Sequence, residues 1–161
     1  MGSSVAETFV QEHGWSVRGI SRDPSKPSAK AWIARGIGLV AADLDLLGSI
    51  GKAFSGANVF FGTTDFVQHL LDPKMIAKAQ EQRRSVNELA TEHEFKQAKS
   101  LIDAVAANIS TIDLFVLSTL SDTKGLSHGK IQYNLHFDCK WAAVEYLKEN
   151  SLELWKKTSL L

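Results

Sequence analysis

The chain has 161 residues, close to the roughly 150 residues that one domain typically takes. Hydrophobic residues make up 44% and charged residues 22% of the sequence, which excludes wholesale disorder. The 18 Lys and Arg side chains balance the 18 Asp and Glu side chains, so the chain lacks the net positive charge typical of nucleic-acid-binding proteins. A single cysteine, Cys139, excludes an internal disulfide and a thiolate zinc site.

The apolar runs of the sequence are far shorter than the roughly 20 residues that a membrane-spanning helix needs. The first residues also lack the basic and then apolar pattern of a secretory signal. We therefore expect no membrane contact and a cytoplasmic location, to which the nucleus can be added. We expect no direct contact with nucleic acid.

Hydrophobic patterns predict helices that alternate with short strands along the whole chain. The expected helices lie around residues 5–10 and over residues 28–35, 46–54, 73–108 and 136–150. The expected strands lie at residues 16–20, 37–42, 58–61 and 113–117, and residues 155–161 resemble the start of a fifth strand. This alternation is typical of crossover units on a parallel sheet.

Finer features of three elements also follow from the sequence. Ser4 and Glu7 have the spacing of a capping box at the start of the first helix. Asn87 is a candidate break that would divide residues 73–108 into two helices. The strands at residues 37–42 and 58–61 carry no charge, so we expect both of their faces to be buried.

Residues 36–41 match the glycine fingerprint of dinucleotide-binding proteins in form only. That fingerprint must follow a strand and open a helix, so that backbone N–H groups meet the pyrophosphate. Here a helix precedes it and a strand follows it. We therefore interpret Gly36 as the residue that ends a helix.

Arg22 and then Asp23 follow the first predicted strand. In nucleotide-binding crossover folds, an acid at this place selects the free 2′-hydroxyl of the adenosine ribose, whereas an arginine selects a 2′-phosphate. The order of the two residues favours a phosphate partner. A surface arginine in a turn is the alternative that spacing alone leaves open.

Lys140 lies one helical turn after His136 in the last predicted helix. In short-chain reductases a tyrosine and a lysine share this spacing, and the lysine assists the tyrosine that acts as the acid. Here His136 occupies the tyrosine position, and Tyr133 lies in the preceding loop. We expect Cys139 to be an unreactive core residue.

Three separate segments, residues 17–24, 56–66 and 136–146, resemble the NmrA-like family, and residues 42–45 and 94–99 fit as well. This family comprises atypical relatives of the short-chain dehydrogenases, including fungal nitrogen-repression regulators and NADPH-sensing proteins. The resemblance implies an α/β, Rossmann-like, doubly wound parallel sheet with helices on both faces, which binds NADP(H).

The resemblance also implies a set of cofactor-binding residues. Arg22 would hold the 2′-phosphate with Lys26 nearby, Asp43 and Leu44 would flank the adenine, and Lys140 would touch the nicotinamide ribose. The cofactor channel would be lined by Thr64, Asp65 and Phe66, with Lys96 reaching in from a helix. Gly2 would belong to the end of the glycine-rich turn.

The sequence departs from the family pattern at both ends. We expect residues 1–161 to form a single, incomplete domain that lacks the first strand and the C-terminal substrate region. A missing first strand would expose two neighbouring strand edges, through which a second copy could pair.

We expect an NADP(H)-binding regulator or redox sensor with a protein partner, because position 136 carries no tyrosine. One alternative is an NADPH-dependent reductase of a small carbonyl or quinone, in which Lys140 or His136 supplies protons. Another is a truncated copy that binds no cofactor.

Overall fold

The computed structural model describes residues 1–161, apart from the side chain of Leu47. Its strands are β1 (Arg18–Ser21), β2 (Gly38–Ala41), β3 (Val59–Gly62), β4 (Leu114–Leu117) and β5 (Thr158–Leu160). Its helices are α1 (Gly2–Phe9), α2 (Pro27–Ala34), α3 (Leu47–Phe54), α4 (Phe66–Leu70), α5 (Pro73–Gln82), α6 (Val86–Ala106), α7 (Thr123–Leu126), α8 (Leu135–Asn150) and α9 (Leu152–Trp155). The paired strands all run parallel, which confirms the predicted α/β class.

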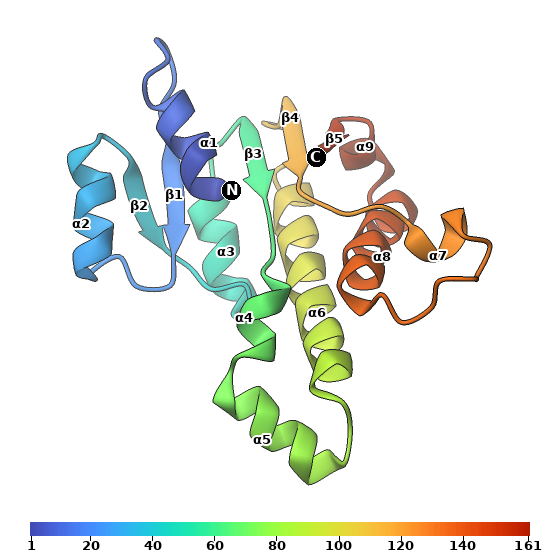
Figure 1. Cartoon of the computed structure of the whole chain (residues 1–161). Helices are drawn as coiled ribbons and strands as arrows, with labels where there is room; N and C mark the ends of the chain where they lie inside the picture. The colour runs from blue at the N-terminus through green and yellow to red at the C-terminus, as the bar shows by residue number, and fades with distance from the viewer.

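The strands form two separate sheets, with β1 paired to β2 and β4 lying between β3 and β5 (Figure 1). The Ser21 carbonyl of β1 bonds toward β2, and the Gly62 carbonyl of β3 bonds toward β4. Because the backbone groups of successive strand residues point to opposite sides, those of Ile20 and Phe61 point away from these partners. Each of β1 and β3 thus has one edge without a strand partner among the described residues. These are the two edges that we expected to be exposed.

Helices cover both faces of the strands (Figure 1). Helix α6 packs against α3 and α8 on one face, and α1 contacts β3 on the other. The main core lies between β3, β4 and the layer of α3, α6 and α8. Its fully buried members include Ile50, Ile102, Val105, Phe115, Val144 and Leu147.

The β1–β2 pair is attached to the rest of the molecule through α3. The Arg18 guanidinium on β1 donates to the carbonyl oxygens of Ala53 (2.8 Å) and Ser55 (2.9 Å) at the end of this helix. These carbonyls have no partner within the helix, so a cation at this end satisfies them. Ile50 and Phe54 of α3 lie in the main core, so the contact ties β1 to that core.

The predicted start of the first helix is wrong. Helix α1 begins at Gly2, with Met1 as its N-cap and no capping side chain. Ser4 therefore lies inside the helix, where its carbonyl accepts from the Thr8 hydroxyl (2.9 Å). The helix start that a capping box would serve lies three residues earlier than Ser4 predicts, because Met1 is the N-cap.

The break within residues 73–108 lies before Asn87 rather than at it. Arg83 ends α5 in the left-handed conformation, with φ at 52°. The Ser85 hydroxyl and the Glu88 carboxylate then form a capping box at the start of α6. Because this box fixes the start of the helix, Asn87 falls in its first turn.

The expected burial of two strands is only partly correct. In β2, Gly38 and Ala41 are exposed and the two residues between them are half-buried, so the prediction of two buried faces is wrong. In β3, buried Phe60 and Gly62 alternate with half-buried residues. The reason is the divided sheet, because β1, β2 and β3 each have a strand partner on one side only.

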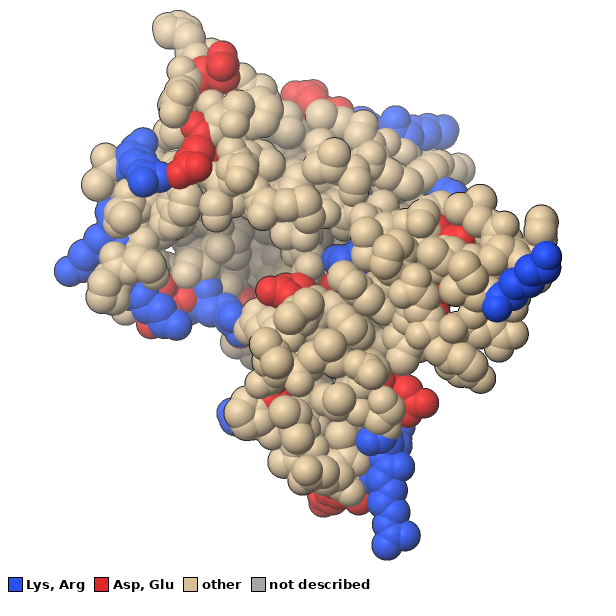
Figure 2. Space-filling model, in the orientation of Figure 1, with Lys and Arg blue, Asp and Glu red and all other residues tan. Residues whose placement is uncertain are grey.

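Positive and negative side chains are interspersed on the face seen in Figure 2. The same face is hollowed between the regions of α1 and α4 (Figure 2). Within the part of the chain that the structure describes, no helix combines the length and the apolar character that crossing a membrane requires.

Candidate functional site

The carboxyl ends of β1, β2 and β3 lie at one edge of the strands, above α4 in Figure 1. In open α/β sheets this edge is where ligands bind. Arg22 follows β1, Asp43 follows β2 and Thr64 follows β3, so the parallel order brings three predicted site residues to this edge. We call it the carboxyl-end crevice.

A buried polar network lies where β3 leaves the sheet. The Glu94 side chain of α6 is 1% exposed, and its Oε1 lies 3.0 Å from the Lys140 Nζ of α8. The same oxygen lies 2.6 Å from the Thr64 hydroxyl, and Glu94 Oε2 lies 2.9 Å from the Cys139 thiol. Lys140 also donates to the Thr64 carbonyl (3.1 Å) and to its hydroxyl (3.0 Å).

The direction of each hydrogen bond in this network is determined by its members. An ammonium only donates and a carboxylate only accepts. The Thr64 hydroxyl must therefore accept from Lys140 and donate to Glu94. The three N–H groups of Lys140 are matched by three acceptors, so the buried charges are paired and fully hydrogen-bonded, as a low-dielectric interior requires.

Cys139 is held in its neutral form. Burial, and then the hydrogen bond to Glu94, raise the pKa of the Cys139 thiol far above its ordinary value. Its thiolate, which is the nucleophilic form, is therefore suppressed.

We expect the Cys139 thiol of the folded protein to react with iodoacetamide at pH 8 at least about a hundredfold more slowly than in the unfolded chain, because each unit of raised pKa removes tenfold of the thiolate. Mass spectrometry of alkylated protein, with and without guanidinium, measures both rates. Equal rates would contradict the assigned burial. Glutathione in the same tube reports that the reagent is active.

Phe66 and Asp65 join the network to α4. The Phe66 ring is buried and stacks on the His136 ring, with centroids 4.9 Å apart. The Asp65 carboxylate accepts from the Gln68 amide (3.1 Å) and so caps α4. His136 thus lies beside the crevice, whereas Asp65 is engaged in capping the helix.

Arg22 reaches from the end of β1 toward α4. Its guanidinium donates to the Gln68 side-chain oxygen at 2.7 and 3.0 Å when the Gln68 amide is oriented to satisfy both of its ends. The guanidinium is exposed at the crevice. In the same turn the Ser25 hydroxyl and amide hold the pKa of Asp23 below its usual range.

The residues after β2 belong to a second polar cluster. Asp43 accepts from the Asp45 amide (3.0 Å), and Leu44 packs against the main core. The Asp45 carboxylate in turn lies 3.1 Å from His93 Nε2 and accepts from Gln97 (3.2 Å), both on α6. These contacts hold the end of β2 against α6.

The remaining predicted site residues lie outside the buried network. Gly2 begins α1, and a Cβ atom placed there would meet nothing within 4 Å. Lys26 is exposed at the start of α2. Lys96 is exposed on α6 and lies about 200° around the helix from Glu94, because each residue turns the helix by about 100°. It is not brought to the buried network.

Glu94 and Gln68 are the contacts that the sequence-based site did not include. Glu94 does leave a signal in the sequence. It lies in the helical series Ala90, Glu94, Ala98, Leu101 and Val105, which is otherwise apolar and buried. A carboxylate on the apolar stripe of a helix predicts a buried partner of opposite charge.

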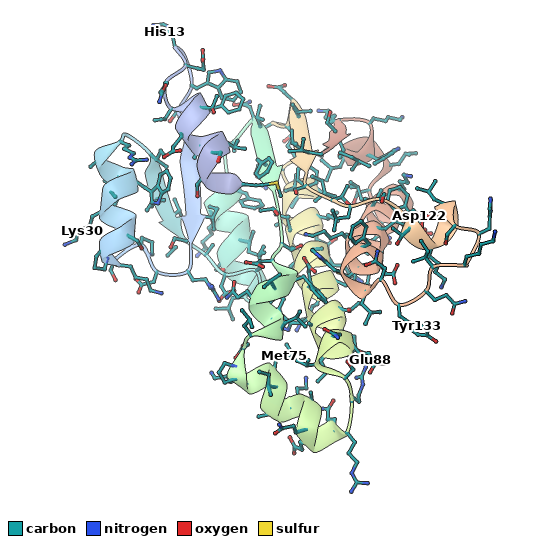
Figure 3. The ribbon with its side chains drawn as sticks, viewed as in Figure 1. His13, Lys30, Met75, Glu88, Asp122 and Tyr133 are labelled. Atoms are coloured by element: carbon teal, nitrogen blue, oxygen red, sulfur yellow. The ribbon has the colours of Figure 1, made fainter. Side chains whose placement is uncertain are left out.

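Tyr133 is not positioned to serve as the acid of a reductase. It is 83% exposed and has a positive φ of 63°. Figure 3 shows it on the outer loop below α8. The residue that lies one turn before Lys140 at the crevice is therefore His136.

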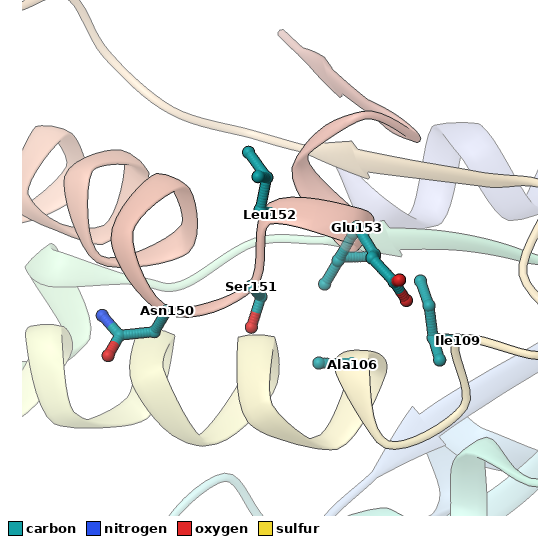
Figure 4. Close-up of a pocket in the computed structure, with 7 residues that line it drawn as sticks. Ala106, Ile109, Asn150, Ser151, Leu152 and Glu153 are labelled. Atoms are coloured by element: carbon teal, nitrogen blue, oxygen red, sulfur yellow. The ribbon is translucent and has the colours of Figure 1, made fainter.

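A hollow of about 260 Å³ lies at the opposite end of the molecule (Figure 4). It is lined by Ala106 and Ile109 at the end of α6 and by residues 150–154 of the turn from α8 into α9. These elements precede β4 and β5, so the hollow lies at the amino ends of the strands. It is remote from the buried network.

Among the solved structures that match this fold are two that cover nearly the whole chain. The chain matches a putative short-chain alcohol dehydrogenase from Burkholderia multivorans with a TM-score of 0.61 and 15% identity, over 99% of this chain and 74% of that one. It matches Pen from Bacillus thuringiensis with a TM-score of 0.59 and 15% identity, over 99% of this chain and 44% of that one. The chain thus spans less than half of the length of Pen.

A family model described as the NmrA-like family matches residues 1–158. This match covers almost the whole chain and agrees with the resemblance of the separate segments noted above. Proteins of this family bind nicotinamide dinucleotides generally. The chain belongs to the NmrA-like family.

Proposed function

We propose that the chain is an NADP(H)-binding regulator or redox sensor that passes the state of its cofactor to a protein partner. The observation that carries this proposal is the line of residues along the carboxyl-end crevice. Arg22 would hold the 2′-phosphate, with Lys26 as a second cation. The adenine would lie at Asp43 and Leu44, and the nicotinamide ribose at Thr64 and Lys140.

The start of α1 fits the pyrophosphate. The first amides of a helix have no partner within the helix, and together with the helix dipole they favour an anion. In α1 no side chain caps them, and Gly2 borders open space. A phosphate group could therefore approach the backbone at Gly2.

Two features favour a sensor over a reductase. Position 136 carries a histidine, whose ring stacks on Phe66. The Lys140 ammonium already donates to three internal acceptors. A bound nicotinamide would supply hydride chemistry, whereas this chain supplies no tyrosine acid beside it.

Titration with NADPH and with NADH, followed by fluorescence of the tryptophans at positions 15, 32, 141 and 155, tests the proposal. We expect a saturable change with NADPH and a weaker response to NADH. No saturable change with either would contradict cofactor binding by this chain. Steady NADPH oxidation with a panel of carbonyls and quinones would instead assign it to the reductases.

Arg22→Ala is expected to weaken NADPH binding by about 10- to 100-fold, because a hydrogen bond to a charged group contributes about 1.5–3 kcal/mol. NADH lacks the 2′-phosphate, so its affinity should change little. Lys30→Ala is the matched control, because it removes one positive charge from α2 at a side chain that points outward (Figure 3). Equal losses for both cofactors would refute the role of Arg22.

A further inference from the structure

Glu94 is the most deeply buried charged side chain of the network, and the resemblance assigns it no role. We propose that Glu94 is a positioning residue that keeps Lys140 charged and fixes Lys140 and Thr64 where the nicotinamide ribose would lie. The inference deepens the proposed function and rests on it. It gives α6 a role in the site through Glu94, which contacts Lys140 and Thr64 and would not itself contact the cofactor.

The first step concerns the charge of Lys140. An ammonium that is buried without a counter-ion tends to lose its proton, because desolvation disfavours the charged form. The titratable groups around this ammonium are Glu94 on α6 and Cys139 and His136 on α8, while the Asp65 carboxylate is bonded to the Gln68 amide. Since the thiol is held neutral, Glu94 is the negative charge in direct contact.

The second step concerns the position of the ammonium. Its three donors are directed to Glu94 and to the two oxygens of Thr64. A ribose hydroxyl could reach Lys140 by replacing one of the Thr64 contacts. The contact with Glu94 would persist, because a hydrogen bond between two charged groups is stronger than one to a neutral oxygen.

The third step concerns Thr64. Its hydroxyl donates to Glu94, so the carboxylate holds both residues that face the ribose, one from each side of the crevice. Thr64 belongs to the segment after β3, and Lys140 belongs to α8. Glu94 on α6 thus contacts both residues and fixes the position of Thr64 relative to Lys140.

The test compares Glu94→Gln with Glu92→Gln. Both variants remove one carboxylate from α6, but the Glu92 side chain is 59% exposed and pairs with Arg84 at the surface. The first readout needs no cofactor. In protein carrying ¹³C-lysine, with the Lys140 signal identified by Lys140→Arg, we expect E94Q to lower the pH midpoint of that signal by at least about two and a half units. An unchanged midpoint in E94Q would overturn the proposal.

The second readout is NADPH affinity between pH 6 and pH 9. In E94Q we expect affinity to fall as pH rises, by at least about tenfold relative to wild type and E92Q, because Lys140 loses its charge within this range. A loss of the same factor at every pH would show a purely structural role and overturn the proposal. Failure of wild type to bind NADPH would refute the proposed function, while the ¹³C readout would still decide whether Glu94 keeps Lys140 charged.

A third variant covers the case in which E94Q does not fold. The double variant Glu94→Gln with Lys140→Met removes both charges. Its midpoint temperature of thermal unfolding should therefore lie closer to that of wild type than the midpoint of either single variant does. Restoration would support the charge pairing. An unfolded double variant beside a folded Lys140→Met single variant would contradict it, because Glu94 would then be needed for packing alone.

Discussion

Lys140→Ala is expected to lower the free energy of unfolding by about 3–5 kcal/mol at pH 8, because it leaves a buried carboxylate without its partner. The side chains of Lys140 and Glu94 are only 9% and 1% exposed, so water does not replace the lost contact. Urea unfolding at pH 8, followed by circular dichroism, measures the difference from wild type.

Lys148→Ala is the control for this experiment. It changes the same residue type on the same helix, but Lys148 is exposed and contacts the rings of Trp141 and Trp155 at 5.1 and 4.7 Å. Such contacts at exposed sites contribute about 0.5–1 kcal/mol. If Lys140→Ala cost no more than Lys148→Ala at pH 8, the buried pair would not carry the assigned charges.

This prediction also bears on assays of function. A variant that removes Lys140 should lose cofactor binding and stability together, so a loss of binding alone does not identify a ribose contact. A change at the Thr64 hydroxyl, which bonds to Lys140 and Glu94, should cost less stability than the loss of Lys140. Loss of binding in Lys140→Ala should therefore be interpreted only at a temperature where the variant is still folded.

Phe115→Ala is expected to lower the free energy of unfolding by about 3–5 kcal/mol, the cost typical of deleting a large core side chain. Phe115 is completely buried in β4, which lies between β3 and β5. Its ring fills the space beside Gly62, where a Cβ atom would lie 3.1 Å from the Phe115 Cε2. Urea unfolding monitored by tryptophan fluorescence gives the value.

Phe115→Leu is the matched variant, because it keeps an apolar side chain and leaves a smaller cavity. We expect it to lower the free energy of unfolding by about half as much as Phe115→Ala or less, because the cost rises with the volume of the cavity left behind. If both variants lowered the free energy of unfolding by the same amount, the lost volume of the ring would not be the cause of the destabilisation. The comparison then separates cavity formation from a general intolerance of substitution in β4.

The order of helices and parallel strands could be predicted from the sequence because it depends on local patterns. Apolar runs such as residues 113–117 act over a few positions. The Ser85–Glu88 spacing is equally local, but the predicted break at Asn87 did not make use of it. The division of the sheet sets the burial of each strand, and a strand's own residues do not encode how many partners it has. For this reason the burial of β2 was overestimated.

The candidate site was predictable in part for the same reason. Arg22 and Thr64 follow strands, so parallel topology places them at one edge. The pairing of Glu94 with Lys140 joins residues 46 positions apart on two helices, so it depends on how α6 packs against α8. Lys96 was assigned to the crevice from the resemblance alone, and the turn of the helix places it on another side than Glu94.

The attachment of β1 and β2 has a consequence for how the molecule opens. This pair and the residues that follow its strands are joined to the remainder by side chains alone, through the contacts of Arg18 with α3, of Arg22 with α4 and of Asp45 with α6. No backbone ladder crosses from β1 to β3 among the described residues. Residues 16–45 therefore form a unit that can separate at lower free energy than the sheet of β3, β4 and β5. Such an opening would dismantle the adenosine half of the crevice and leave the buried charge pair intact. A dinucleotide that contacts both halves would stabilise the closed form. Its binding should therefore raise the free energy of opening of residues 16–45 before that of the remaining structure.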